Sequence, residues 1–402
     1  MKKMFFKGYR FVLSIIRGIL NIICSFLPMN NEILLESHPD LTCNTWPLFQ
    51  HMIKEKLNEK LKITWMVNDP KLYEEKYNNL SNVSFIEIRP KGIIKRVKKY
   101  VRCNRARCII TSNRFVPKKY VGNKQVNIYL DHGSPLKDCK KLFEKANFGC
   151  DYYISQGPLF TETIMDQYNL KKSQVICLGL PRNDELFLNK NSIELLYNDI
   201  HDFDKIIIWV PTFREHMDKK RVDVDTHFPL GIPILYTKND VQALNNFLRK
   251  NKVLLIIKPH PAQDISVLKD FNVSNIRFLY NSDLEKYNIQ TNELLAQTDA
   301  MISDYSSIYW DYLLLNRPIG ITLDDYEQYK TQFGFAFEHP IDVLIGEYIY
   351  NYDDLQSFID HVSKNIDIMK KQRETIKQQA QVGPDYESTK RVYDFIIKKL
   401  GG

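Results

Sequence analysis

The chain has 402 residues, of which 44% are hydrophobic and 26% are charged. This composition is typical of a folded globular protein and excludes a largely disordered chain. A chain of this length usually divides into two domains. The net charge of +8 suits an anionic partner such as a membrane surface, a nucleotide or a phosphorylated polymer, but no basic tail or known motif singles out nucleic acid.

The cysteines indicate a reducing compartment. Their number is odd, their spacing is irregular, and no Cys-x-x-Cys pair occurs. Free thiols fit this pattern better than a disulfide framework or a zinc site. The seven are Cys24, Cys43, Cys103, Cys108, Cys139, Cys150 and Cys177.

Residues 1–28 are predicted to form an amphipathic helix that associates with a membrane. The apolar stretch from residue 4 to residue 27 has no good cleavage site, which argues against a signal peptide. Arg17 and Asn21 interrupt it, which argues against a transmembrane helix. Polar or small residues recur every three or four positions, so one face would present basic side chains to anionic lipid. The alternative is a core helix of the first domain.

Residues 29–190 are predicted to form a first Rossmann-like lobe, on the side of the acceptor substrate. Short apolar runs alternate with helical stretches, which favours a parallel sheet flanked by helices. The predicted strands are residues 33–37, 63–67, 83–86, 108–111, 126–130 and 175–178, and the predicted helices are 46–57 and 93–101.

Residues 191–375 are predicted to form a second such lobe, on the side of a nucleotide donor. The alternation weakens between residues 184 and 204 and then starts again. The predicted strands are 205–210, 253–257, 276–279 and 300–302, and the predicted helices are 240–249, 292–297 and 354–366. Residues 376–402, with a helix over 388–400, would pack back on the first lobe. Two such units imply a cleft, with ligands beyond the carboxyl ends of the strands.

Three clusters of polar residues follow predicted strands of this cleft. After residue 130 comes Asp131-His132-Gly133-Ser134-Pro135-Leu136-Lys137, in which His132 is suited to act as a base near neutral pH. Residues 179–184 contain Arg182, and residues 211–215 contain Arg214; either arginine is suited to grip a phosphate. The alternatives are a turn histidine and surface arginines in salt bridges.

A fourth cluster is Lys258-Pro259-His260-Pro261, after the apolar run 253–257. Prolines on both sides restrict the backbone around the histidine, which favours a positioned site group over packing.

The fifth cluster is Ser303-Asp304-Tyr305-Ser306-Ser307, between a predicted strand and a predicted helix. Ser and Asp side chains cap helix starts, and the free N–H groups there can hold a phosphate. The alternative is an ordinary capping turn. Nucleotide-binding loops of the Gly-x-x-x-x-Gly-Lys and Gly-x-Gly-x-x-Gly types and the His-Glu-x-x-His zinc motif are absent from the sequence.

These five clusters, in this order and with Asp311 and Pro318, resemble the CDP-glycerol glycerophosphotransferases, the primases and polymerases of teichoic acids and capsules. The resemblance covers about residues 33–323. It implies a GT-B-like fold, a place on the cytoplasmic face of the bacterial membrane, and transfer of glycerol phosphate from CDP-glycerol to a lipid-linked acceptor hydroxyl, with release of CMP.

The resemblance also assigns residue roles. His132, His260 and Asp131 are the expected catalytic residues: His132 matches the family's base, His260 matches the histidine at the donor pyrophosphate, and Asp131 would orient His132. Gly133, Ser134 and Lys137 are expected on the acceptor side. The residues expected to bind the donor are Arg182, Arg214, Lys258, Ser303, Asp304, Ser306 and Ser307.

The sequence departs from the family pattern at three places. Asp131 stands where the family often has Trp, residues 333–336 read Phe-Gly-Phe-Ala instead of Arg-Gly-Phe-Tyr, and Ile341 follows Pro340 instead of Gly. The donor is therefore open to CDP-ribitol or another CDP-polyol. No tightly bound cofactor or metal is expected, with Mg²⁺ on the diphosphate and a homo-oligomer left open. The alternatives are a GT-B glycosyltransferase that uses a nucleotide sugar and a non-catalytic scaffold that binds anionic polymer.

Overall fold

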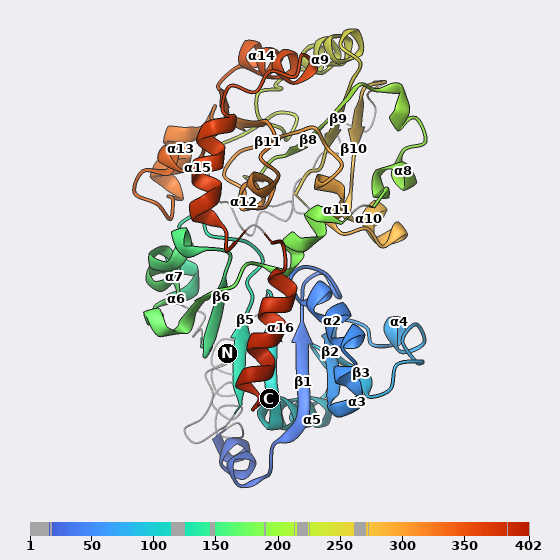
Figure 1. The fold of residues 1–402 in the computed structure, drawn as a ribbon, viewed down its shortest axis with the longest axis vertical. Helices are drawn as coiled ribbons and strands as arrows, with labels where there is room; N and C mark the ends of the chain where they lie inside the picture. The colour runs from blue at the N-terminus through green and yellow to red at the C-terminus, as the bar shows by residue number, and fades with distance from the viewer. Residues whose placement is uncertain are drawn as a thin grey trace, which may run out of the picture.

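The computed structural model describes residues 16, 18–113, 125–144, 149–188, 190–212, 214, 224, 226–260, 271, 273–383 and 385–401. These residues form two α/β lobes, one above the other in Figure 1, each built on a parallel sheet. The bounds of the first-lobe strands are β1 (Asn30–Glu36), β2 (Lys62–Val67), β3 (Val83–Glu87), β4 (Ala106–Thr111), β5 (Val126–Tyr129), β6 (Tyr152–Ser155) and β7 (Val175–Cys177).

The first sheet has the strand order β3-β2-β1-β4-β5-β6-β7, and all its neighbours are parallel. Its middle strands are buried runs such as Ile33–Glu36, as expected where helices cover both faces of a parallel sheet. The helices of this lobe are α2 (Thr45–Lys54), α3 (Leu57–Lys60), α4 (Lys71–Glu74), α5 (Ile93–Arg105), α6 (Lys140–Glu144) and α7 (Thr161–Tyr168).

The second sheet has the order β10-β9-β8-β11-β12-β13, again all parallel. Its strands are β8 (Lys205–Val210), β9 (Val253–Ile257), β10 (Ile276–Phe278), β11 (Ala300–Ser303), β12 (Ile319–Thr322) and β13 (Glu347–Ile349). Its helices are α8 (Ser192–Leu196), α9 (Lys238–Lys250), α10 (Asn281–Tyr287), α11 (Thr291–Leu295), α12 (Ile308–Tyr312), α13 (Tyr326–Gln332), α14 (Tyr352–Ser363) and α15 (Lys370–Ala380). In both sheets the strand order reverses beside the first strand of the lobe, and such reversals open ligand crevices.

The last helix, α16 (Ser388–Lys399), returns to the first lobe and lies along its sheet (Figure 1). Its side chains Val392 and Ile396 are buried in the same core as Ile33 and Trp65. The predicted boundary at residue 375 falls inside α15, so the helices that follow the second sheet continue unbroken to Ala380.

Most of the predicted N-terminal helix lies outside the described residues, but residues 18–26 are helical. Asn21 and Cys24 face the protein, and Asn21 Oδ1 accepts a hydrogen bond of 2.6 Å from the Tyr100 hydroxyl group. Ile22 and Phe26 are exposed, so residues 18–26 pack one face on the protein and leave another face open. Nowhere in the described part of the chain does a helix have the length and apolarity needed to cross a membrane.

Candidate active site

The loop that follows β5, residues 131–138, carries the predicted histidine cluster into contact with the second lobe. Its backbone pairs with residues 334–336 of that lobe, through the N–H of Ala336 to Leu136 O at 2.9 Å and the N–H of Asp138 to Gly334 O at 3.1 Å. A Cβ atom on Gly133 would lie 2.4 Å from Ser307 Oγ, so only glycine allows the two lobes to approach this closely here. Residues 333–336, one of the three places that depart from the family pattern, therefore lie directly beside the histidine loop.

The side chains of Asp131 and His132 lie in contact within this loop. Asp131 Oδ1 lies 2.9 Å from His132 Nδ1 and accepts the backbone N–H of His132 at 2.6 Å. The Asp131 carboxyl group is buried, whereas the His132 side chain is 56% exposed. Burial alone would raise the pKa of Asp131, but the contact with His132 and the hydrogen bonds from His132 and Tyr153 outweigh it and lower that pKa. An ionised carboxylate thus holds one side of an imidazole whose other side is open.

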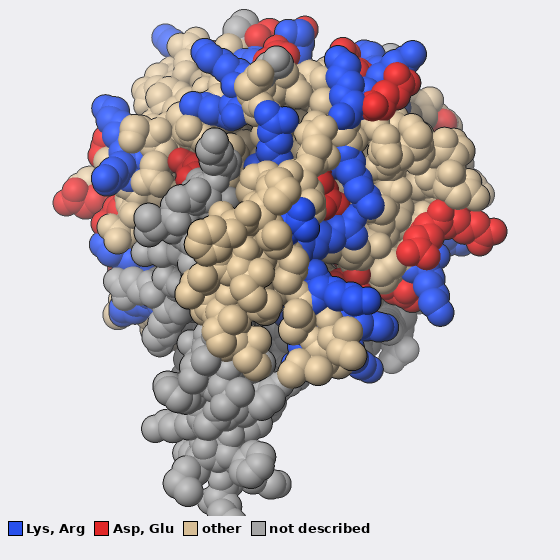
Figure 2. Space-filling view, turned by 90° about the horizontal axis from the view of Figure 1, so that it is seen from below, with Lys and Arg blue, Asp and Glu red and all other residues tan. Residues whose placement is uncertain are grey.

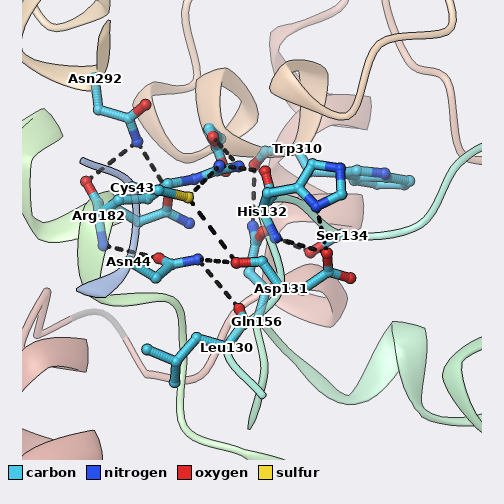
Figure 3. Close-up of polar contacts among 12 residues, drawn as sticks. Cys43, Asn44, Leu130, Asp131, His132, Ser134, Gln156, Arg182, Asn292 and Trp310 are labelled. Carbon is cyan, nitrogen blue, oxygen red and sulfur yellow. Dashed lines mark hydrogen bonds and ion pairs between the residues drawn. The ribbon is translucent and has the colours of Figure 1, made fainter. Parts of the chain in front are cut away.

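Arg182 lies in the 3-10 helix that follows β7 (Pro181–Phe187), close to Asp131 and His132 (Figure 3). Its guanidinium group is bound to other residues of the protein. Its Nη2 lies 2.6 Å from Asp311 Oδ2 of α12, with the two side chains 13% and 1% exposed. Its Nη1 donates to the carbonyl oxygen of His132. Arg182 was predicted to bind a phosphate, but its guanidinium group instead forms an ion pair between the lobes. The sequence did not reveal this pair, because the partner carboxylate comes from a helix far away in the chain.

The Ser303–Ser307 turn is built differently from the prediction. Ser303 Oγ donates to Val210 O at 2.9 Å, and the buried Asp304 accepts the N–H of Thr212 at 3.0 Å and the hydroxyl group of Thr212 at 2.6 Å. Ser307 precedes α12, and no side chain caps that helix. The prediction that Ser and Asp side chains cap the helix is wrong, because they brace β8 and β11 instead. Ser306 and Ser307 are half-buried, and neither hydroxyl group hydrogen-bonds to another residue of the described part.

Arg214 is not exposed as an anion clamp. Its Nε lies 2.6 Å from Asp325 Oδ2 and its Nη1 lies 3.0 Å from Asp304 Oδ2. The guanidinium group also lies over the ring of Tyr305, 5.2 Å from its centroid. Two carboxylates and an aromatic ring leave this buried cation committed to the protein itself, so Arg214 holds the turn at Asp304.

Lys258 and His260 form a separate group at the carboxyl end of β9. Lys258 is buried, its Nζ donates to Asn281 Oδ1 at 2.8 Å, and burial lowers the pKa of Lys258 to about 8. His260 is exposed. Pro261 lies outside the described residues, so of the two prolines that flank His260 only Pro259 is described. In the described part of the chain, no group of three or more His, Cys, Asp or Glu side chains is placed to bind a metal ion.

Several site residues carry no signal in the sequence. Asn44 Nδ2 donates to the carbonyl oxygens of Leu130 and Asp131, at 3.1 and 2.9 Å, and Asn44 Oδ1 accepts the N–H of Arg182 at 3.1 Å. Gln156 accepts from Ser134 at 2.8 Å and donates to Trp310 O at 3.0 Å, which ties Ser134 to α12 (Figure 3). Single amides in loops have no characteristic spacing, so sequence patterns could not reveal them.

The fold is that of a two-lobed GT-B-like protein. The whole chain superimposes on the wall teichoic acid polymerase TagF, with a TM-score of 0.70, 18% identity and 98% of that chain covered. It also superimposes on a UDP-N-acetylglucosamine 2-epimerase, with a TM-score of 0.53, 10% identity and 93% and 97% of the two chains covered. The prediction of two Rossmann-like lobes in a GT-B-like arrangement is confirmed.

The chain belongs to the CDP-glycerol:poly(glycerophosphate) glycerophosphotransferase family, whose model matches residues 19–398. It is 25% identical over 359 residues to a teichoic acid poly(glycerol phosphate) polymerase of Bacillus spizizenii, covering 84% of this chain and 86% of the relative. It is 25% identical over 301 residues to a teichoic acid glycerol-phosphate primase of Bacillus subtilis, covering 70% and 71%. Some relatives are much longer: the chain matches 33% of the ribitol-phosphate polymerase TarL of Staphylococcus aureus. The predicted class of enzyme, a glycerophosphotransferase-family transferase, is confirmed.

Proposed function

We propose that this enzyme transfers glycerol phosphate, or a related polyol phosphate, from a CDP-activated donor to a hydroxyl group of a lipid-linked acceptor, in teichoic-acid or capsule-like polymer synthesis. The observation that carries the proposal is the Asp131–His132 pair, which presents an open imidazole where the two lobes meet. Family membership supports the donor class. Relatives act on both glycerol phosphate and ribitol phosphate, so the polyol is the open part of the proposal.

The chemistry needs one proton acceptor and a place for negative charge. Nε2 of His132 accepts the proton of the acceptor hydroxyl while its oxygen forms a bond to the β-phosphorus of the donor. The bond from that phosphorus to the bridging oxygen breaks, and CMP leaves with the electron pair. Asp131 balances the positive charge that develops on His132, and substrates held in line supply much of the rate enhancement.

The second lobe is the proposed donor side. Ser307 faces Gly133 of the histidine loop. In this proposal Ser306 and Ser307, with the backbone N–H groups beside them, bind the diphosphate. His260 and Lys258 lie at the end of β9, where the ammonium form of Lys258 would add positive charge. Arg214 acts indirectly, since it fixes Asp304 and hence the turn. Any Mg²⁺ would arrive with the diphosphate.

The proposed location is the inner face of the cell membrane. Residues 18–26 expose the apolar side chains of Ile19, Ile22, Ile23 and Phe26, and α5 exposes those of Ile93 and Ile94. The two helices are joined by the Tyr100–Asn21 hydrogen bond. Lys91, Lys95 and Lys98 are exposed on and beside α5, and Figure 2 shows Lys and Arg side chains around a tan area at this end of the molecule. Apolar side chains rimmed with positive charge suit the interface of an anionic bilayer.

One assay tests the catalytic proposal. Purified protein is incubated with CDP-glycerol or CDP-ribitol and a lipid-linked acceptor, and CMP release and the mass of the lipid product are measured. We expect CMP and a product heavier by one or more polyol phosphates. His132→Ala and His260→Ala should each abolish turnover in a folded protein, whereas His201→Ala, on the surface, should not. Wild-type turnover in either of the first two variants would remove that residue's role, and a product heavier by a sugar would identify a glycosyltransferase.

A second assay tests the membrane proposal. The full chain should sediment with vesicles that contain phosphatidylglycerol, and replacing both Ile93 and Ile94 with Glu should weaken that binding. Leu72→Glu changes an equally exposed apolar residue on α4 and serves as the control. Equal binding by all three proteins would exclude α5 from the membrane contact.

A further inference from the structure

The carboxylate of Asp131 is bound by three tyrosine hydroxyl groups from three elements of the first lobe. Oδ2 accepts from Tyr153 of β6 and from Tyr168 of α7, the latter at 2.9 Å. Oδ1 accepts from Tyr129 of β5 at 3.4 Å. The tyrosine rings pack on one another, with 4.9 Å between the centroids of Tyr153 and Tyr168. All three tyrosines are buried, so the hydroxyl groups have fixed directions.

Packing alone gives no reason for this arrangement. A buried carboxylate costs free energy, and an apolar side chain of similar size would fill the same space more cheaply. Burial, and then the nearby Asp131, raise the pKa of Tyr153 and of Tyr168, so both hydroxyl groups keep their protons and can only serve this carboxylate as donors. Asp131 also has φ +54°, a left-handed conformation that brings its side chain back to the following residue.

We propose that Tyr153 and Tyr168, assisted by Tyr129, are positioning residues that fix the Asp131 carboxylate so that it holds His132 in the tautomer with the proton on Nδ1. The inference rests on the proposed function, in which His132 is the base. An ionised carboxylate can only accept hydrogen bonds, so a neutral His132 at 2.9 Å must carry its proton on Nδ1. Its Nε2 is then unprotonated and able to take the proton of the acceptor hydroxyl.

The groups around His132 agree with this assignment. Among the described residues, the charged group that contacts His132 besides Asp131 is Arg182, which donates to the backbone carbonyl oxygen of His132 and not to the ring. Arg182 is itself paired with Asp311. Ser307 faces Gly133 from the second lobe. The orientation of the ring therefore depends on Asp131, and the orientation of Asp131 depends on the tyrosines.

The test uses the substrate-free full chain with ¹⁵N-labelled histidine. The ¹⁵N shifts of His132, assigned by comparison with His132→Ala, report its tautomer. We expect the Nδ1–H form to dominate in the wild type and its share to fall at least threefold in the double variant Tyr153→Phe/Tyr168→Phe, which removes only the two hydroxyl groups. Tyr312→Phe is the matched control, because Tyr312 is a buried tyrosine of the second lobe bonded to Thr298. Near-ultraviolet circular dichroism checks folding, and Tyr168→Phe alone replaces the double variant should that not fold.

The same variants are then assayed for CMP release. A catalytic histidine in the wrong tautomer loses up to about 10⁴-fold in kcat, so we expect about a tenfold loss in kcat for the double variant and a larger loss for Asp131→Asn, with KM nearly unchanged. An unchanged tautomer in the folded double variant would overturn the proposal. If the tautomer depends on the tyrosines but His132→Ala keeps full turnover, the positioning holds and the proposed role of His132 fails.

Discussion

The ammonium group of Lys258 is almost out of contact with water, 2.8 Å from Asn281 Oδ1, and burial lowers its pKa to about 8. If its charge helps to bind the donor diphosphate, kcat/KM for the donor should fall as the pH rises through about 8, because the free enzyme then loses this charge. On this descending limb of the pH profile, kcat/KM should fall by up to about tenfold per pH unit. Lys258→Arg keeps its charge at all these pH values and should remove the limb, while Lys258→Met should be slow throughout. A limb that survives in Lys258→Arg would belong to another group.

The same shift has a defined effect on stability. Lys258 in the unfolded chain has an ordinary pKa of about 10.4, so between about pH 8 and pH 10.4 the unfolded state binds more protons than the folded state. This group therefore favours folding more strongly as the pH rises through that window, and not as it falls.

At the scale of single residues, the sequence indicated candidate side chains but not the partners of each. The place of His132 in a loop after a strand could be predicted, because an apolar run followed by a histidine and a glycine leaves a local signal. The arginines could not be read in the same way, since the partners of Arg182 and Arg214 (Asp311, and Asp304 with Asp325) come from distant segments. Whether an arginine binds a ligand or the protein depends on which carboxylate the fold brings to it.

At the scale of elements, long apolar runs were predicted throughout and short ones only in part. The strands at β1, β2, β8 and β9 were predicted within a few residues, because a largely apolar run with three to five consecutive buried residues leaves a clear pattern. β6, β12 and β13, of three or four residues, were missed, whereas the equally short β5, β7, β10 and β11 were predicted, so a run of this length gives only an uncertain signal. α15 was also missed, because few of its residues are buried.

The return of α16 to the first lobe depends on a contact at its start. The carboxylate of Asp184 accepts the N–H groups of Ser388 at 2.9 Å and Thr389 at 2.7 Å, the first residues of the helix. Asp184→Ala leaves both donors without this acceptor and should lower the free energy of unfolding by about 1 kcal/mol, the usual effect of losing a helix cap. Urea unfolding measures it, with Asp353→Ala in the first turn of α14 as the control. A difference below about 0.3 kcal/mol would mean that the buried side chains of α16 suffice to hold it.

At the scale of the whole molecule, the two lobes meet through contacts that also build the site. The Gly133–Ser307 approach, the pairing of residues 136–138 with 334–336 and the Arg182–Asp311 ion pair all join the histidine loop to the second lobe. Reversals of strand order predict where a crevice opens in each sheet, but they do not predict how two lobes dock. The relative placement of the acceptor and donor sides could therefore come only from the structure.

The Arg182–Asp311 pair allows docking and catalysis to be separated. Asp311→Leu leaves the Arg182 guanidinium buried without its carboxylate and should lower the free energy of unfolding by about 3–5 kcal/mol. Adding Arg182→Met replaces the pair with apolar side chains of similar volume and should recover most of that loss. Turnover should stay low in the double variant, because Arg182 also donates to the carbonyl oxygen of His132 and so fixes the histidine loop. Denaturant unfolding and CMP release, measured on the wild type, Asp311→Leu, Arg182→Met and the double variant, complete the cycle. If turnover recovers together with stability, the pair serves docking alone, and positioning of His132 must come from Asp131 and its tyrosines.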